Sequence, residues 1–120
     1  MSISFGRLGD VCLKLGRTDE ALKYFNLKFE ISKVLAEADP NDSQKQRDLL
    51  VSHYKLGQVY RSVKDSAKSL AAFDAALEIA RSLKQKGLLA EEIDGLINAL
   101  EAERKQSEQL RDAPRMEAVG

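Results

Sequence analysis

Apolar residues recur three and four positions apart through most of the chain, which is the spacing of one face of an α-helix. Helix-breaking residues interrupt this pattern at Gly16, Pro40, Lys64-Asp65 and Gly87. Alternating apolar and polar positions, typical of a half-buried strand, are missing. The pattern therefore predicts an all-α fold with five helices, at about 2–16, 18–38, 43–63, 66–86 and 89–111.

Short polar side chains stand where three of these helices are expected to begin. Thr18 can cap the second helix, and one of Asn41, Asp42 or Ser43 can cap the third. Asp65 can cap the fourth. Such side chains accept hydrogen bonds from backbone N–H groups that have no partner inside the helix.

The first and third predicted helices, and likewise the second and fourth, share residues at a shift of 48 positions. The residues of the first half that are repeated in the second are Ser4, Leu8, Gly9, Val11, Leu22, Phe25, Glu30, Ile31 and Leu35. Gly9 and its counterpart Gly57 fall inside helices, where glycine costs about 1 kcal/mol relative to alanine. This cost is explained if a neighbouring helix crosses there and needs the space of the missing Cβ, with Phe25 and Phe73 in the seam. A fixed period of two helices is typical of an α-solenoid.

Over about residues 3–86 the chain resembles the tetratricopeptide repeat family. The family signature has an aromatic residue, Leu-Gly and Tyr on the first helix, then Ala and Phe on the second. The first repeat reads Phe5, Leu8, Gly9, Cys12, Ala21 and Phe25, and the second reads His53, Leu56, Gly57, Tyr60, Ser69 and Phe73. The family's usual period is about 34 residues, so a period of 48 indicates a long-helix variant with one extra heptad in each helix. This variant is similar to extended arrays in some large bacterial proteins.

The resemblance implies a short right-handed α-solenoid of antiparallel helix-turn-helix repeats with a C-terminal capping helix. We expect a single domain at 1–112, with repeat one at about 2–40, repeat two at about 41–87 and the polar capping helix at about 88–111. Residues 113–120 are expected to be a flexible tail. The first helix is short beside the third, so the chain is interpreted as a piece of a longer array or as a truncated protein.

Composition narrows the possible functions. Nineteen basic and nineteen acidic residues give a net charge of zero, so no field of one sign attracts nucleic acid or an anionic membrane. No apolar run reaches the roughly 18 residues of a membrane span, and the start does not resemble a signal peptide, which indicates a cytoplasmic protein. The only histidine, His53, and the only cysteine, Cys12, occupy packing positions of the signature. We therefore expect no catalytic residue, metal or cofactor.

The resemblance also implies a groove lined by the first helices of the repeats. Its positions fall on Gly6, Asp10, Leu13 and Lys14 in the first repeat and on Tyr54, Lys55, Gln58, Arg61 and Ser62 in the second. The residues expected to contact a partner are Asp10, Lys14, Tyr54, Lys55, Gln58 and Arg61. An ordinary solvated helix face is the alternative interpretation. The family's carboxylate clamp needs Lys and Asn where Gly6 and Asp10 stand, so that specialised role is not expected.

Two kinds of function remain open. The first is a non-enzymatic protein-interaction module that holds a peptide or a partner helix in the groove. The second is a structural spacer or self-assembly unit, a fragment of a longer repeat array. An apolar N-terminal edge at Ile3 and Phe5, expected to face outward, favours the second and predicts a homodimer through this edge.

Overall fold

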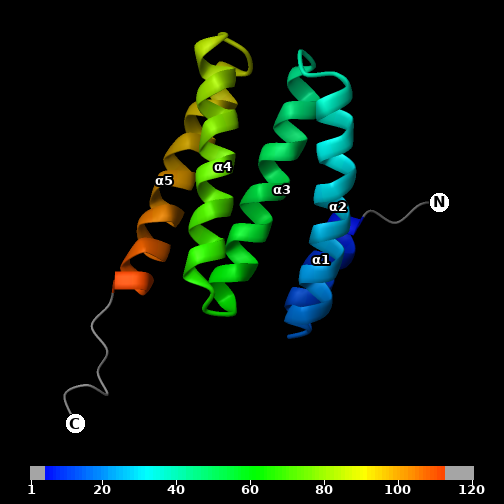
Figure 1. The fold of residues 1–120 in the computed structure, drawn as a ribbon, viewed down its shortest axis with the longest axis vertical. Helices are drawn as coiled ribbons and strands as arrows, with labels where there is room; N and C mark the ends of the chain where they lie inside the picture. The colour runs from blue at the N-terminus through cyan, green and yellow to red at the C-terminus, as the bar shows by residue number, and fades with distance from the viewer. Residues whose placement is uncertain (1–4, 113–120) are drawn as a thin grey trace.

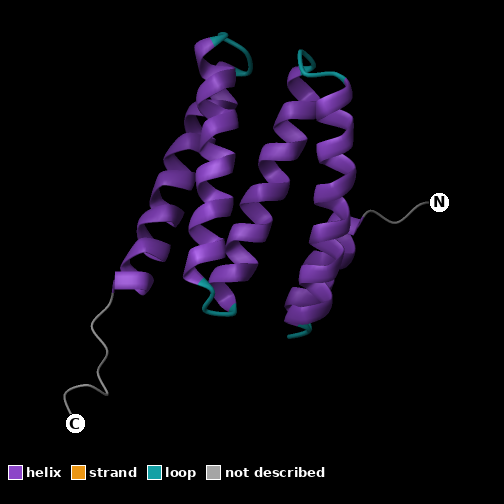
Figure 2. Ribbon diagram, viewed as in Figure 1, coloured by secondary structure: helices purple, strands orange, loops and turns teal. Residues whose placement is uncertain are grey.

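The computed structural model describes residues 5–112, which fold into five helices with no strand in this range (Figures 1 and 2). The helices are α1 (Phe5–Lys14), α2 (Thr18–Ala38), α3 (Ser43–Ser62), α4 (Ser66–Gln85) and α5 (Ala90–Asp112). Each helix packs on the next one along the chain, and α3 also contacts α5. This confirms the predicted all-α fold of stacked helical repeats, in which each unit contacts its neighbours alone.

Polar caps begin two of the helices, as predicted. The carboxylate of Asp42 accepts hydrogen bonds from two backbone N–H groups in the first turn of α3, at 3.0 and 3.2 Å. The carboxylate of Asp65 accepts one in α4, at 3.1 Å. The predicted cap at Thr18 is wrong, because Thr18 is the first residue of α2 and Arg17 holds the cap position without a side-chain hydrogen bond.

Residues with positive φ occur in three of the four turns between the helices. Gly16 and Gly87 have φ values of +76° and +70°, in the left-handed region where a side chain is unfavourable. Lys64, in the turn between α3 and α4, adopts the same region with φ +67°. These conformations end α1, α4 and α3 at the positions where the sequence pattern predicted breaks.

The helices of each repeat cross at a glycine. A Cβ built on Gly9 would lie 2.7 Å from the ring of Phe25, and one on Gly57 would lie 2.6 Å from the ring of Phe73. Both phenylalanine rings are fully enclosed. The interpretation that the repeated glycine makes room for a crossing helix is therefore confirmed in both repeats.

Two hydrophobic clusters run along the stack. The cluster around α1, α2 and their junction with α3 and α4 contains Cys12, Ala21, Phe25, Leu56, Val59 and Ala72. The cluster between α3, α4 and α5 contains Leu50, Phe73, Ala76, Leu77, Ala80, Leu83, Ile93, Ile97 and Leu100. The solenoid thus buries its apolar residues between successive helices rather than in one central core.

Two departures from the repeat signature are accommodated by local contacts. Ser69 replaces the usual alanine, and its buried hydroxyl donates to the carbonyl of Gly57 at 2.9 Å. The buried hydroxyl of Ser107 lies 2.7 Å from the Ser69 oxygen and must be the donor there, because the Ser69 proton is already used. His53 replaces the aromatic residue and packs on the ring of Phe29, with 4.8 Å between the ring centroids.

The predicted outward position of Phe5 is wrong. Phe5 is half-buried, and its ring stacks on that of Tyr24 with 6.2 Å between the centroids. Ile3, the other residue of that prediction, and the predicted tail at 113–120 lie outside the described residues. The start of α1 is therefore packed against α2.

Candidate functional site

The first helices of successive units, α1, α3 and α5, form one face of the solenoid. Lys55 Nζ on α3 lies 3.4 Å from Asp10 Oδ1 on α1. Arg61 Nη1 on α3 lies 2.6 Å from Glu103 Oε2 on α5. The backbones of α1 and α3 are not in contact, and neither are those of α2 and α4, so Asp10 and Lys55 meet through their side chains. The term first-helix face is used below for the surface of α1, α3 and α5 that carries these ion pairs.

The pair between Arg61 and Glu103 is the most enclosed contact of this face. Their side chains are 22% and 18% exposed. Neither Arg61 Nη1 nor Glu103 Oε2 has a hydrogen-bond partner among the described residues, so their contact is an ion pair alone. Each charge therefore depends on the other, since an enclosed charge without its counterion is strongly destabilising. Arg61 is not a free guanidinium, contrary to what its groove position suggested.

Tyr54 lies partly inside the core. The edge of its ring packs on Phe73 with 6.1 Å between the centroids. Burial raises the pKa of the Tyr54 phenol, Glu103 adds to this rise, and Arg61 opposes it. The phenol is therefore neutral at physiological pH and can donate a hydrogen bond. The ring is partly covered by the core, and a partner can contact the rest of it.

The remaining predicted groove residues differ in how much they are engaged. Leu13 is half-buried and packs on the α1–α2 cluster. Ser62 is exposed, and its hydroxyl donates to the Gln58 carbonyl at 3.2 Å. The side chains of Lys14 and Gln58 have no hydrogen-bond or ion-pair partner among the described residues. Of the six residues predicted to contact a partner, three are thus already paired within the protein and two are free.

A hollow of about 490 Å³ opens at the end of this face. The residues that line it are Arg61, Ser62, Lys64, Gln106 and Gln109. Its lining combines amides, a hydroxyl and two cationic side chains, so it can form hydrogen bonds with the polar groups of a polypeptide. Sequence reasoning missed the contribution of α5, because α5 lacks the Leu-Gly signature that located the other two helices.

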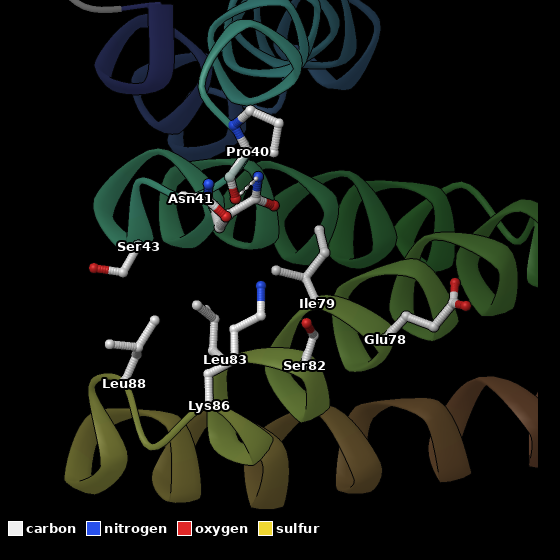
Figure 3. A pocket seen from close by; sticks show the side chains of 10 residues that line it. Pro40, Asn41, Ser43, Glu78, Ile79, Ser82, Leu83, Lys86 and Leu88 are labelled. Carbon is white, nitrogen blue, oxygen red and sulfur yellow. Dashed lines mark hydrogen bonds between the residues drawn. The ribbon is translucent and has the colours of Figure 1, made fainter.

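A second hollow, of about 230 Å³, lies beside the α2–α3 turn (Figure 3). The residues that line it are Pro40, Asn41, Ser43, Gln46, Glu78, Ile79, Ser82, Leu83, Lys86 and Leu88. Figure 3 shows Ile79 and Leu83 of α4 pointing toward the start of α3. The amide of Gln46 is occupied there by a hydrogen bond to the Pro40 carbonyl at 3.3 Å.

Cys12 and His53 have packing roles. Cys12 is buried, with its Sγ 3.9 Å from a carboxylate oxygen of Glu20. Burial lowers the pKa of the His53 imidazole, and the nearby Lys33 lowers it further. Among the described residues no group of three or more His, Cys, Asp or Glu side chains could hold a metal ion. No helix in this part of the chain is long and apolar enough to cross a membrane.

Comparison with known proteins agrees with the geometry of the repeats. The tetratricopeptide repeat family model matches residues 4–33 and 50–93, which together are more than half of the chain. No curated protein and no solved structure shows significant similarity to the chain. Tetratricopeptide repeats generally mediate protein–protein interactions. The matched segments contain both glycine crossings, and the chain belongs to the tetratricopeptide repeat family.

Proposed function

We propose that the protein is a non-enzymatic interaction module that holds a peptide or a helix of a partner protein along the first-helix face. The observation that carries this proposal is the bridging of α1, α3 and α5 by Asp10–Lys55 and Arg61–Glu103. These pairs connect three helices from successive units in the free protein, although the partly exposed Asp10–Lys55 pair stabilises this arrangement by at most about 1 kcal/mol. A surface that is already ordered loses little conformational entropy on binding.

The free side chains of this face define the contacts that we expect. Lys14 and Gln58 can pair with a carboxylate and a backbone amide of the partner without breaking an existing contact. Tyr54 offers a phenol and part of its ring, which is a residue type enriched at the energetic centres of interfaces. Asp10, Lys55 and Arg61 would support the face mainly by holding the helices together.

A peptide display selection on the immobilised protein tests this proposal. Fluorescence anisotropy then measures the affinity of the selected peptide for variants of single residues. Lys14→Ala and Gln58→Ala are each expected to weaken binding about tenfold, a change of roughly 1.4 kcal/mol. The matched control is Lys23→Ala, which removes an exposed lysine from α2. Equal losses for Lys23→Ala and Lys14→Ala would contradict the proposal.

A second candidate function is a structural unit onto which another repeat stacks. Val11 on α1 is 52% exposed, whereas its counterpart Val59 on α3 is 1% exposed in a cluster with Phe25 of α2. No described helix covers Val11 in the way that α2 covers Val59. A neighbouring repeat or a second copy of the chain, as a homodimer through this edge, would bury Val11 together with the exposed Leu15.

Sedimentation of the protein at increasing concentration tests the second candidate. Self-association that disappears when Val11 and Leu15 are both replaced by serine would support stacking through α1. A monomer at about a hundred micromolar, well above the Kd of most stable assemblies, would exclude a homodimer through this edge.

The opposite end of the stack supports a capping role for α5. Its buried side carries Ile93, Ile97 and Leu100, which join the cluster with α4. Its exposed side is polar, with Asp94 and Lys105 among the exposed residues. We propose that residues 1–112 act as one domain of two repeats closed by this helix, since a polar outer face is what terminal units of solenoids require.

A further inference from the structure

Lys64, in the turn between α3 and α4, has a backbone conformation that is unusual for its residue type. Its φ of +67° lies in the left-handed region, which residues with a Cβ rarely adopt. Its counterpart in the first repeat, 48 positions earlier, is Gly16, with a φ of +76°. The two turns therefore have the same conformation at this position, and the second repeat carries a side chain where glycine would be free of strain.

No contact within the described residues accounts for this lysine. Leu89, the other non-glycine residue with a positive φ in that part of the chain, packs against the cluster between α3, α4 and α5. The side chain of Lys64 is exposed and has no hydrogen-bond or ion-pair partner among the described residues. The helix dipole favours a cation near the end of α3, but by less than the left-handed conformation typically costs. Residues held in such conformations cluster at binding sites.

The Lys64 side chain lines the hollow of about 490 Å³ at the end of the first-helix face. Figure 1 shows that α1, α3 and α5 all end on this side of the molecule. The side chains of Gln106 and Gln109, from α5, also line the hollow and have no partner among the described residues. Each of their amides offers two N–H donors. None of the described residues that line the hollow carries a carboxylate.

The carboxylates that neighbour these lining residues are already engaged. Glu103 forms the enclosed ion pair with Arg61, so the guanidinium group in the hollow is neutralised. Asp65 accepts a hydrogen bond from the backbone N–H of Lys68 at 3.1 Å, and its carboxylate lies 4.0 Å from the Lys68 ammonium group. The charge of the hollow that has no counterion within the described residues is therefore that of Lys64.

We propose that this hollow binds the carboxylate of an aspartate or glutamate side chain in the peptide or helix held by the first-helix face. This inference rests on the proposed function and adds the chemistry and the position of one contact. The ammonium group of Lys64 matches a single carboxylate, and the amides of Gln106 and Gln109 can donate to its oxygens. A phosphate group carries up to two charges and is typically bound by free arginines, whereas Arg61 is already paired.

Chemical-shift titration of the isotope-labelled protein tests this contact directly. The probe is the peptide Ac-Gly-Glu-Gly-NH2, and the neutral control is Ac-Gly-Gln-Gly-NH2. Both are added to about 10 mM, which detects affinities in the millimolar range. The backbone amide of Lys64 and the side-chain amides of Gln106 and Gln109 should shift with the glutamate peptide. They should stay unchanged with the glutamine peptide.

Three variants separate the charge of Lys64 from the fold. Lys64→Gly should abolish the response to the glutamate peptide and raise the urea midpoint of unfolding, because glycine relieves the left-handed strain. A raised midpoint also shows that the lost response is not caused by unfolding. Lys64→Arg should keep the response. The matched control is Lys86→Ala, which removes an exposed lysine without a partner at the end of α4 and should leave the response unchanged.

Three results would overturn the proposed carboxylate contact. They are equal shifts with the two peptides, an undiminished response in Lys64→Gly, and larger shifts with inorganic phosphate at the same concentration, which would assign the hollow to phosphate. A display-selected peptide whose affinity depends on Lys14 and Gln58 but not on Lys64 would refute this contact and leave the proposed function standing. A response to the glutamate peptide in a protein that selects no peptide would refute the proposed function instead.

Discussion

Replacing Gly57 by alanine tests whether the glycine crossing determines how the helices of a repeat pack. The new methyl carbon would lie 2.6 Å from Cε1 and 2.8 Å from Cδ1 of the Phe73 ring. Carbon atoms in contact prefer a separation of about 3.5–4.0 Å. The ring would have to move by about 1 Å to restore that separation, and it is fully buried between α3, α4 and α5.

Two effects of opposite sign decide the outcome. Overpacking a closed core typically costs about 1–3 kcal/mol. Replacing a glycine inside a helix by alanine stabilises the helix by about 1 kcal/mol. Because three ring atoms lie within 2.8 Å of the new carbon, the overpacking should be near the top of its range. The net prediction for Gly57→Ala is a loss of about 1–2 kcal/mol in the free energy of unfolding.

Urea unfolding followed by circular dichroism measures this loss, and Gly95→Ala is the matched control. Gly95 also lies inside a helix, but a Cβ there would meet no atom within 4 Å. Gly95→Ala should therefore raise the free energy of unfolding by about 0.5–1 kcal/mol. The two midpoints should differ by about 1 M urea. If Gly57→Ala is as stable as Gly95→Ala, the account of the crossing is refuted.

Three further predictions concern single contacts of the repeats. Burial, and to a smaller extent Lys33, lower the pKa of His53 in the folded protein, so the unfolded chain binds the proton more tightly. The free energy of unfolding should therefore fall as the pH drops from about 6.5 toward the lowered pKa. His53→Phe should remove this pH dependence in urea titrations between about pH 7 and 5. Ser69→Ala should cost about 1–2 kcal/mol because it leaves the buried Ser107 hydroxyl unpaired, and adding Ser107→Ala should cost less than the sum of the single losses in a double-mutant cycle. Asp65→Ala should lower the thermal unfolding free energy by about 1 kcal/mol through loss of the α4 cap, and an unchanged midpoint would argue against that cap.

Local signals in the sequence were sufficient to predict the helices and their pairing. The glycine and the phenylalanine that packs on it both recur after 48 residues, as Gly9 with Phe25 and Gly57 with Phe73. This repetition allowed the helix crossing to be located from the sequence. The cap at Asp65 follows from the same short-range logic. The predicted cap at Thr18 is wrong because the cap position lies one residue earlier, at Arg17. Sequence propensity does not resolve the end of a helix to a single residue.

The pairing of side chains across the first-helix face could not be predicted. Asp10 and Lys55 lie 45 residues apart, and their contact depends on how far apart α1 and α3 are held by the helix between them. Tyr54 was predicted as a groove residue, but its ring orientation depends on Phe73 of the next helix. The exposure of Leu35 was also missed, because its counterpart in the second repeat, Leu83, has the same residue type and is buried.

The most direct test of the proposed function is an amide chemical-shift titration of the isotope-labelled protein with a display-selected peptide. The chain has a mass of 13.3 kDa, which is well suited to this measurement. The amides of Lys14, Gln58 and Ser62 on the first-helix face are expected to shift most. The amides of Lys23 on α2 and Ala71 on α4 are expected to stay unchanged. Shifts confined to α2 and α4, with those of the first-helix face unaffected, would contradict the proposal that this face binds the partner.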